Sequence, residues 1–167
     1  MTELIIHNRK ALPEDVPRML ALVKELATYE RAPHEVTITE EEFFNDGFGP
    51  HPAYTCWVAE CNGVVRGMAL CYVRYSTWKG RCLYLEDIVV EEAWRGQGIG
   101  KFLFEQVVAE AAAGDYAALV WQVLDWNEPA LRFYARFGAQ LDNGWINSKL
   151  NREQLRAYMQ RKNPRKK

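Results

Sequence analysis

The stretch over residues 83–114 constrains the fold more than any other part of this chain. It begins as an apolar, β-branched strand over residues 83–90, continues into a glycine-rich turn and ends in an amphipathic helix. The turn is Arg95-Gly96-Gln97-Gly98-Ile99-Gly100, whose alternate glycines let the backbone turn tightly and direct successive N–H groups at one point. The positive end of the helix dipole adds to this. The stretch therefore predicts a pyrophosphate site.

Two common nucleotide-binding motifs do not match this turn. A P-loop requires a glycine five positions before Gly100, where Arg95 stands, and a Ser or Thr after Lys101, where Phe102 stands. The dinucleotide fingerprint G-x-G-x-x-G has a different spacing, and no acidic residue ends a following strand as ribose binding requires. R-x-x-G-x-G remains, with an ordinary glycine-rich turn before a helix as the alternative interpretation.

The composition is typical of a packed globular protein. With 167 residues, 49% of them hydrophobic, the chain predicts one domain over residues 1–160 and a solvated basic tail over residues 161–167. No run approaches the roughly 18 apolar residues of a membrane span, and the first residues do not begin a signal peptide. A net charge of -1 gives no general attraction to nucleic acid. We therefore expect neither membrane nor nucleic acid as a partner.

The cysteines predict a reducing location. Cys56, Cys61, Cys71 and Cys82 lie in strand-like segments without C-x-x-C spacing. This pattern favours neither a zinc site nor a secreted disulfide framework. We expect a cytoplasmic protein without a bound metal.

The other segments predict a mixed α/β fold. Apolar residues at helical spacing, capping signals and proline positions predict helices over residues 13–30, 39–45, 102–113, 127–137 and 152–160. Alternating or continuous apolar runs predict strands over residues 4–9, 54–61, 64–75, 83–90, 118–124 and 144–150. Asn62-Gly63 predicts a tight antiparallel hairpin, and Gly67 a bulge or a close backbone approach. Residues 118–124 are apolar on both faces, which predicts a strand parallel to residues 83–90.

Two acidic residues interrupt the apolar strand before the glycine turn. Strand alternation predicts that Glu86 and Asp87 point to opposite faces, because successive side chains alternate. One face would hold Leu83, Leu85, Asp87 and Val89, and the other Tyr84, Glu86, Ile88 and Val90. A carboxylate is hard to keep inside a sheet unless it has a use, and pairing with a nearby cation is the structural alternative to a catalytic role.

R-x-x-G-x-G between a strand and a helix resembles the coenzyme A signature of the GCN5-related N-acetyltransferases (GNAT). More of the chain resembles the spermidine/spermine (diamine) acetyltransferase family within them. The matching segments run from the first helix to the last strand: residues 25–30, 46–49, 51–54, 84–87, 95–100, 126–127 and 133–134.

Within that family, residues 75–81 and 123–127 resemble the thialysine acetyltransferase branch more than the polyamine branch. The polyamine enzymes have an aspartate where this chain has Ser76, and an acidic residue common to both branches is here Asn143. Losing two anions argues against long polyamines as the best substrate.

The resemblance implies a mixed, mostly antiparallel sheet with helices on both faces and two splayed parallel strands that form the acetyl-coenzyme A cleft. It implies Glu86 as the base, acting through water, and Tyr134 as the acid that protonates the departing sulfur. The implied cofactor-binding residues are Ile88, Val89, Val90, Arg95, Gly96, Gln97, Gly98, Ile99, Gly100, Lys101, Asn127 and Tyr134. A buried tyrosine on an apolar helix stripe is more often a core residue, so the family position supplies this assignment.

The resemblance also implies the acceptor site and the assembly. Tyr29, Glu30, Trp78 and Glu86 are the implied substrate residues, since an aromatic face and a carboxylate suit an ammonium group. Trp78 and Trp145 fit core positions equally well. The expected protein is a homodimer that acetylates a small diamine or diamino acid. Polyamine acetylation, acetylation of a protein lysine or N-terminus, and coenzyme A binding without catalysis are the alternatives.

Overall fold

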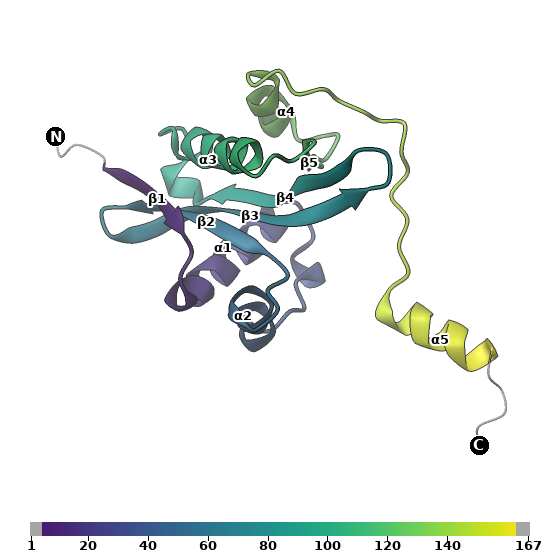
Figure 1. Ribbon diagram of the computed structural model, residues 1–167. Helices are drawn as coiled ribbons and strands as arrows, with labels where there is room; N and C mark the ends of the chain where they lie inside the picture. Colours follow the sequence, from purple (N-terminus) through teal and green to yellow (C-terminus); the bar gives the residue numbers. More distant parts are fainter. Residues whose placement is uncertain (1–4, 163–167) are drawn as a thin grey trace. The chain divides into compact units, whose positions relative to one another are not determined.

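The computed structural model describes residues 5–162 (Figure 1), and the chain divides into two compact units, the first ending at Gln122 and the second beginning at Val123. The strands of the first unit are β1 (Ile6–Lys10), β2 (Thr55–Cys61), β3 (Val64–Ser76), β4 (Gly80–Val90) and β5 (Leu119–Trp121). Its helices are α1 (Val16–Tyr29), α2 (Glu40–Phe48) and α3 (Ile99–Ala113). The expected strand residue 4 and tail residues 163–167 lie outside the described part of the chain.

The strands form one mixed sheet in the order β1-β2-β3-β4-β5. All neighbours are antiparallel except β4 and β5, which pair in parallel as predicted. The predicted hairpin between β2 and β3 is confirmed, with positive φ angles of 52° at Asn62 and 80° at Gly63. The predicted capping box of α2 is confirmed as well, because Thr39 and Glu42 bond to each other's backbone N–H groups.

Helices cover both faces of this sheet: α1 and α2 lie on one face and α3 on the other (Figure 1). On the α1 face Met19 and Leu22 are fully buried against Val58 and Met68 of the strands. Burying each such side chain contributes roughly 1.5–3 kcal/mol. The sheet is therefore packed between helices on both faces, and polar side chains of a site are expected at the ends of its strands.

A β-bulge interrupts the pairing of β3 with β4. Leu70 pairs with Asp87 and Cys71 with Leu85, so Glu86 is the extra residue. Paired residues share a face, whereas the neighbours Leu70 and Cys71 occupy opposite faces. Asp87 therefore lies on the opposite face of the sheet from Leu85.

The bulge changes the faces that the sequence predicts for this strand. Tyr84, Glu86 and Asp87 all lie on the face covered by α1, since the partners of Tyr84 and Asp87 on β3 are two residues apart. Ile88 and Val90 pair with residues of the α3 face. The predicted alternation was thus wrong beyond Glu86, and the two carboxylates share a face instead of pointing apart.

The second unit contains α4 (Glu128–Ala135) and α5 (Arg152–Lys162). Asn127 caps α4 by accepting a hydrogen bond from the N–H of Ala130 at 3.3 Å, which confirms the predicted cap. The strand predicted over residues 144–150 is not formed. Its side chains are exposed, and an isolated extended segment gains no ladder hydrogen bonds.

Gly67 provides a test of this packing. It follows Arg66, the extra residue of a second bulge, and a Cβ at Gly67 would lie 2.9 Å from the Val89 carbonyl oxygen and 3.0 Å from Leu103. Gly67→Ala should therefore lower the free energy of unfolding by about 1–3 kcal/mol in urea denaturation. Gly144→Ala, at an exposed position, should change it by less than about 0.5 kcal/mol. Equal effects of the two substitutions would contradict the close approach at Gly67.

Candidate active site

The end of β4 has a free edge next to the glycine turn. β5 pairs only with residues 83–85 of β4, whereas β4 continues to Val90. In the described part of the chain, residues 86–90 therefore pair with β3 alone. Unpaired backbone groups on a strand edge can bind an extended ligand. A pantetheine arm is a ligand of this kind.

The glycine turn has the backbone geometry that an anion site requires. Gly96 and Gly98 have φ angles of 77° and 86°, and a Cβ at either would meet nothing within 4 Å. Gly98 caps α3, whose first N–H groups have no partner within the helix. Ile99 is buried, so only its backbone can reach a ligand. The turn thus fits a pyrophosphate.

Three carboxylates gather where β4 meets the end of α1. Burial, together with the negative charges of Glu86 and Glu30, raises the pKa of Asp87 to about 6. Burial also raises the pKa of Glu30. Within residues 5–162, none of the ion pairs involves these three side chains. The cluster therefore attracts a cationic ligand.

Two tyrosines of the same face line this cluster. The rings of Tyr72 and Tyr84 have centroids 5.1 Å apart. Burial raises the pKa of each phenol, and the charge of Glu86 adds to the effect. The Glu86 carboxylate at the bulge therefore lies close to both phenols.

The structure brings some of the predicted substrate residues together and not others. Glu30 and Glu86 both interact electrostatically with Asp87, and Tyr29 precedes Glu30 at the end of α1. Trp78 lies at the tip of the β3–β4 hairpin and is 84% exposed. The strand from the tip to Glu86 spans about 20 Å, at 3.3 Å per residue. Trp78 thus lies far from these carboxylates.

The other two predicted site residues belong to the second unit. Asn127 is buried at the start of α4, where its side chain caps the helix. Tyr134 is buried, and its ring meets the Phe133 ring edge-on, with centroids 5.2 Å apart. Their roles toward a cofactor stay predictions.

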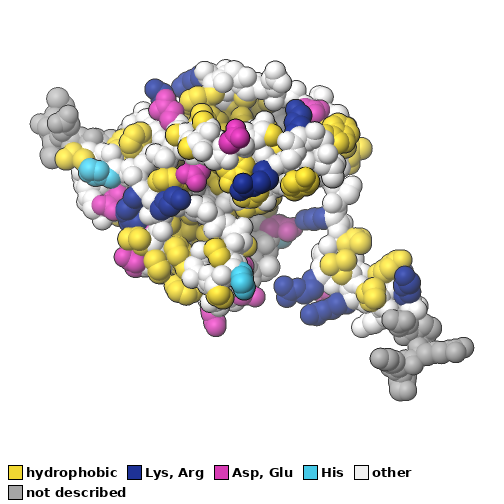
Figure 2. Space-filling model, in the orientation of Figure 1, with side chains coloured by type: hydrophobic (Ala, Val, Ile, Leu, Met, Phe, Trp, Pro, Cys, Tyr) yellow, Lys and Arg dark blue, Asp and Glu magenta, His cyan; other side chains and the backbone are white. Residues whose placement is uncertain are grey.

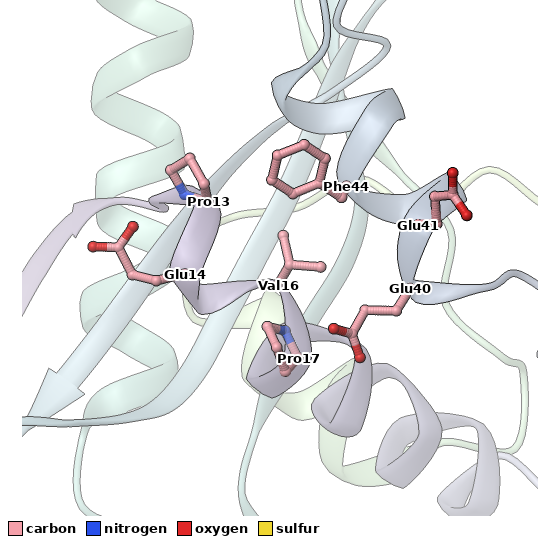
Figure 3. A pocket seen from close by; sticks show the side chains of 7 residues that line it. All are labelled: Pro13, Glu14, Val16, Pro17, Glu40, Glu41 and Phe44. Atoms are coloured by element: carbon pink, nitrogen blue, oxygen red, sulfur yellow. The ribbon is translucent and has the colours of Figure 1, made fainter.

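A shallow hollow of the first unit lies away from this cluster (Figure 3). It is lined by Pro13, Glu14, Val16, Pro17, Glu40, Glu41 and Phe44. It lies at the first residues of α1, about 20 Å along the helix axis from Tyr29. The hollow is therefore separate from the candidate active site.

Among residues 5–162, no three His, Cys, Asp or Glu side chains are grouped so as to hold a metal ion. None of the helices in that range has both the length and the apolar character needed to cross a membrane.

Comparisons with known proteins identify the family of this chain. Residues 19–139 match the sequence profile of the acetyltransferase (GNAT) family. The thialysine N-epsilon-acetyltransferase of Bos taurus is 43% identical over 140 residues, covering 79% of this chain and 82% of that protein. The spermidine/spermine N(1)-acetyltransferase-like protein 1 of Homo sapiens is 32% identical over 157 residues, covering 88% of this chain and 23% of that longer protein.

The fold has counterparts among solved structures. That of the aminoglycoside N-acetyltransferase AAC(6')-Iy in complex with CoA has a TM-score of 0.72 at 16% identity, covering 89% of this chain and 96% of that chain. The mixed sheet and the glycine turn are thus those of a GNAT-fold N-acetyltransferase, as predicted. The chain belongs to the acetyltransferase (GNAT) family, in its spermidine/spermine acetyltransferase-like group and on the thialysine branch.

The structure adds Asp87 and Tyr72 to the residues that the sequence predicts for the site. The signal for Asp87 was a carboxylate in an apolar strand, but an unbroken alternation placed it on the face opposite Glu86. No pattern within the sequence marks Tyr72, because its place beside Glu86 depends on the register between β3 and β4.

The raised pKa of Asp87 has a consequence for stability. Its folded-state pKa of about 6 exceeds its ordinary 3.8, so the neutral carboxyl stabilises the fold, and this contribution is lost as the pH rises through 6. Asp87→Asn should therefore raise the free energy of unfolding at pH 8 by about 1–3 kcal/mol and leave it unchanged near pH 3.

Urea denaturation across this pH range measures the difference. Glu14→Gln, which changes an exposed carboxylate elsewhere, serves as the control and should give a flat difference. A destabilised Asp87→Asn at pH 8 would show that the ionised carboxylate has a stabilising partner, contrary to the arrangement described.

Proposed function

We propose that this N-acetyltransferase transfers the acetyl group of acetyl-coenzyme A to a primary amine of a small, thialysine-like diamino acid. The observation that carries the proposal is the cluster of Glu30, Glu86 and Asp87 beside the free edge of β4. Members of this family use acetyl-coenzyme A as the acetyl donor. The names of the relatives support a diamino acid as the acceptor.

In the proposed reaction the amine attacks the acetyl carbonyl carbon in a ternary complex. Glu86 removes the proton from the ammonium group through a water molecule, which frees the nitrogen lone pair. The new C–N bond forms as the C–S bond breaks, Tyr134 protonates the sulfur, and the second proton that the nitrogen loses restores the Tyr134 phenol. One proton is released overall. Asp87 is a second candidate for the base, since a pKa of about 6 suits a base near neutral pH.

The donor is proposed to lie along β4 and over the glycine turn. Backbone groups of residues 88–90 would contact the pantetheine arm, and residues 96–101 would hold the pyrophosphate through backbone N–H groups. Lys101 would add a positive charge there, and Asn127 is the further proposed contact of the donor. The positive φ angles of the two glycines and the open space beside them support this placement.

We further propose that the chain works as a homodimer. Residues 139–150 form an extended arm with several exposed apolar side chains, including Trp145 at 74% and Ile146 at 92%. Hydrophobic side chains also show on the surface of α5 (Figure 2), which carries exposed Leu155 and Met159. Exposed apolar patches of this kind mark association surfaces. In a dimer, Trp78 could reach the amine site of the partner subunit.

The alternatives make different demands on the same site. A polyamine enzyme would use the hairpin tip, where Ser76 Oγ accepts hydrogen bonds from the N–H groups of Trp78 and Lys79 at 3.2 Å each. A protein acetyltransferase requires a peptide groove beside Glu86, and a non-catalytic binder requires no base. As the location we propose the cytoplasm, because all four cysteines are free and buried.

Thiol release from acetyl-coenzyme A with a panel of amines tests the reaction. Thialysine, lysine and ornithine should give a higher kcat/KM than putrescine and spermidine, because the hairpin tip lacks the extra anion that a longer polycation would pair with. A preference for spermidine would reject the diamino acid and favour the polyamine alternative. Acetylation of none of the amines would shift the proposal to a protein substrate or a binding role.

The same assay separates the acid and base. Glu86→Gln and Tyr134→Phe should each lower kcat by about 10²-fold or more while acetyl-coenzyme A still binds. Tyr158→Phe and Glu14→Gln make the same chemical changes at exposed positions and serve as controls. Full activity of Glu86→Gln together with a large loss in Asp87→Asn would assign the base to Asp87.

Sedimentation equilibrium tests the dimer. The wild-type chain should sediment at twice its monomer mass, and Ile146→Gln in the arm should raise the dimer dissociation constant about tenfold or more. Val108→Gln changes an exposed apolar residue of α3 and should leave the constant unchanged. A wild-type chain that stays monomeric at high micromolar concentration would reject the proposal.

A further inference from the structure

The segment that joins β4 to the glycine turn is held by a side chain of α1. The Glu25 Oε1 atom accepts a hydrogen bond from the backbone N–H of Glu92 at 2.7 Å. The same oxygen lies 3.8 Å from a guanidinium nitrogen of Arg95. Because Arg95 is the first residue of the turn, this one carboxylate of α1 contacts both the approach to the turn and its start.

The guanidinium of Arg95 has two further partners. Its Nε–H donates a hydrogen bond to the carbonyl oxygen of Val90 at 3.1 Å. Its central carbon lies over the ring of Tyr29, 5.1 Å from the centroid, at cation–π distance. Glu25 and Tyr29 are four residues apart on α1 and so share one face of the helix. Arg95, whose side chain is 38% exposed, thus contacts both α1 and the end of β4.

Lys101, the other cation near the turn, has a different setting. Its side chain is 65% exposed and pairs with Glu105 of the same helix at 3.5 Å. An exposed pair of this kind is worth little and breaks easily, so Lys101 is available to a phosphate. Arg95 would have to leave an ion pair, a hydrogen bond and an aromatic face to do the same.

We propose that Arg95 is a positioning residue that links the coenzyme A turn to the amine site through Glu25 and Tyr29, and that it is not a ligand of the phosphates. This inference rests on the proposed function, because it takes Tyr29 and Glu30 as part of the amine site. A shift of the turn when the phosphates bind moves Arg95, and Arg95 moves the ring of Tyr29. The affinities for donor and amine are therefore coupled, and the coupling is reciprocal.

The affinity for coenzyme A, measured by calorimetry, distinguishes a positioning residue from a phosphate ligand, because Glu25→Gln should change this affinity in opposite directions in the two cases. If Arg95 positions the turn, Glu25→Gln weakens coenzyme A binding by about threefold to tenfold, as Arg95→Gln does, and the double variant binds no worse than either. If Arg95 is a phosphate ligand, Glu25→Gln removes a competing anion and tightens binding. Unchanged or tighter binding by Glu25→Gln therefore overturns the inference.

A donor without phosphates separates the roles a second time. With S-acetylpantetheine in place of acetyl-coenzyme A, Arg95→Gln should still raise the KM for the amine by about fivefold, since the link to Tyr29 is lost. Lys101→Gln is the matched control and should affect only the KM for acetyl-coenzyme A. An amine KM that Arg95→Gln leaves unchanged with S-acetylpantetheine overturns the inference.

Two further measurements keep the outcomes distinct. Urea denaturation of each variant shows whether the fold is intact. Arg95→Lys should raise the KM for the amine as Arg95→Gln does, because lysine lacks the planar fork of arginine. If the wild type acetylates no amine, the proposed function fails, while the coenzyme A binding cycle still decides the role of Arg95.

Discussion

The hydrogen-bond register between β3 and β4 is the constraint on which the candidate site depends. One extra residue, Glu86, separates the two regular stretches of this ladder. It turns Asp87 to the face of α1 and leaves Ile88 and Val90 on the face of α3. A regular strand would have placed Asp87 beside Leu85, against the apolar packing of α3, where an ionised carboxylate is costly. The acidic cluster thus follows from a single backbone irregularity.

The structural features that the sequence predicted correctly are those that depend on residues close together in the chain. The Asn62-Gly63 hairpin, the Thr39 capping box and the positive φ angles at the glycine turn are local signals, and each is found in the structure. Gly67 also marked a bulge correctly, because a missing side chain at a close approach is itself a local fact. The bulge at Glu86 left no such mark, since alternation along one strand assumes an unbroken register with its partner. The unformed strand over residues 144–150 fails for a related reason: its pattern is right, but a ladder requires a second strand.

The acidic cluster lacks the cationic partners that Asp15 and Glu91 have. Asp15 pairs with Arg9 at 2.6 Å, which lowers its pKa, and Glu91 accepts from both Arg18 and Arg66 at 2.7 Å. Burial and the charge of its neighbours instead raise the pKa of Asp87. Groups that are costly to keep ionised in the free protein, and that a cation would stabilise, are typical of binding sites. A positively charged ligand bound beside Asp87 would therefore offset the cost of keeping this carboxylate ionised in the folded protein.

This electrostatics also bears on why an acceptor with two amines suits the proposed function. A carboxylate cluster raises the pKa of any amine bound within it, whereas acetylation requires the amine to lose its proton. One group cannot satisfy both demands well. A diamino substrate divides them: one ammonium group can remain charged between Glu30 and Asp87, while the other lies at the edge of the cluster beside Glu86 and gives up its proton. The spacing between the two amines then selects the substrate, which accounts for a preference among diamines of different length without any change in the acetyl-transfer chemistry.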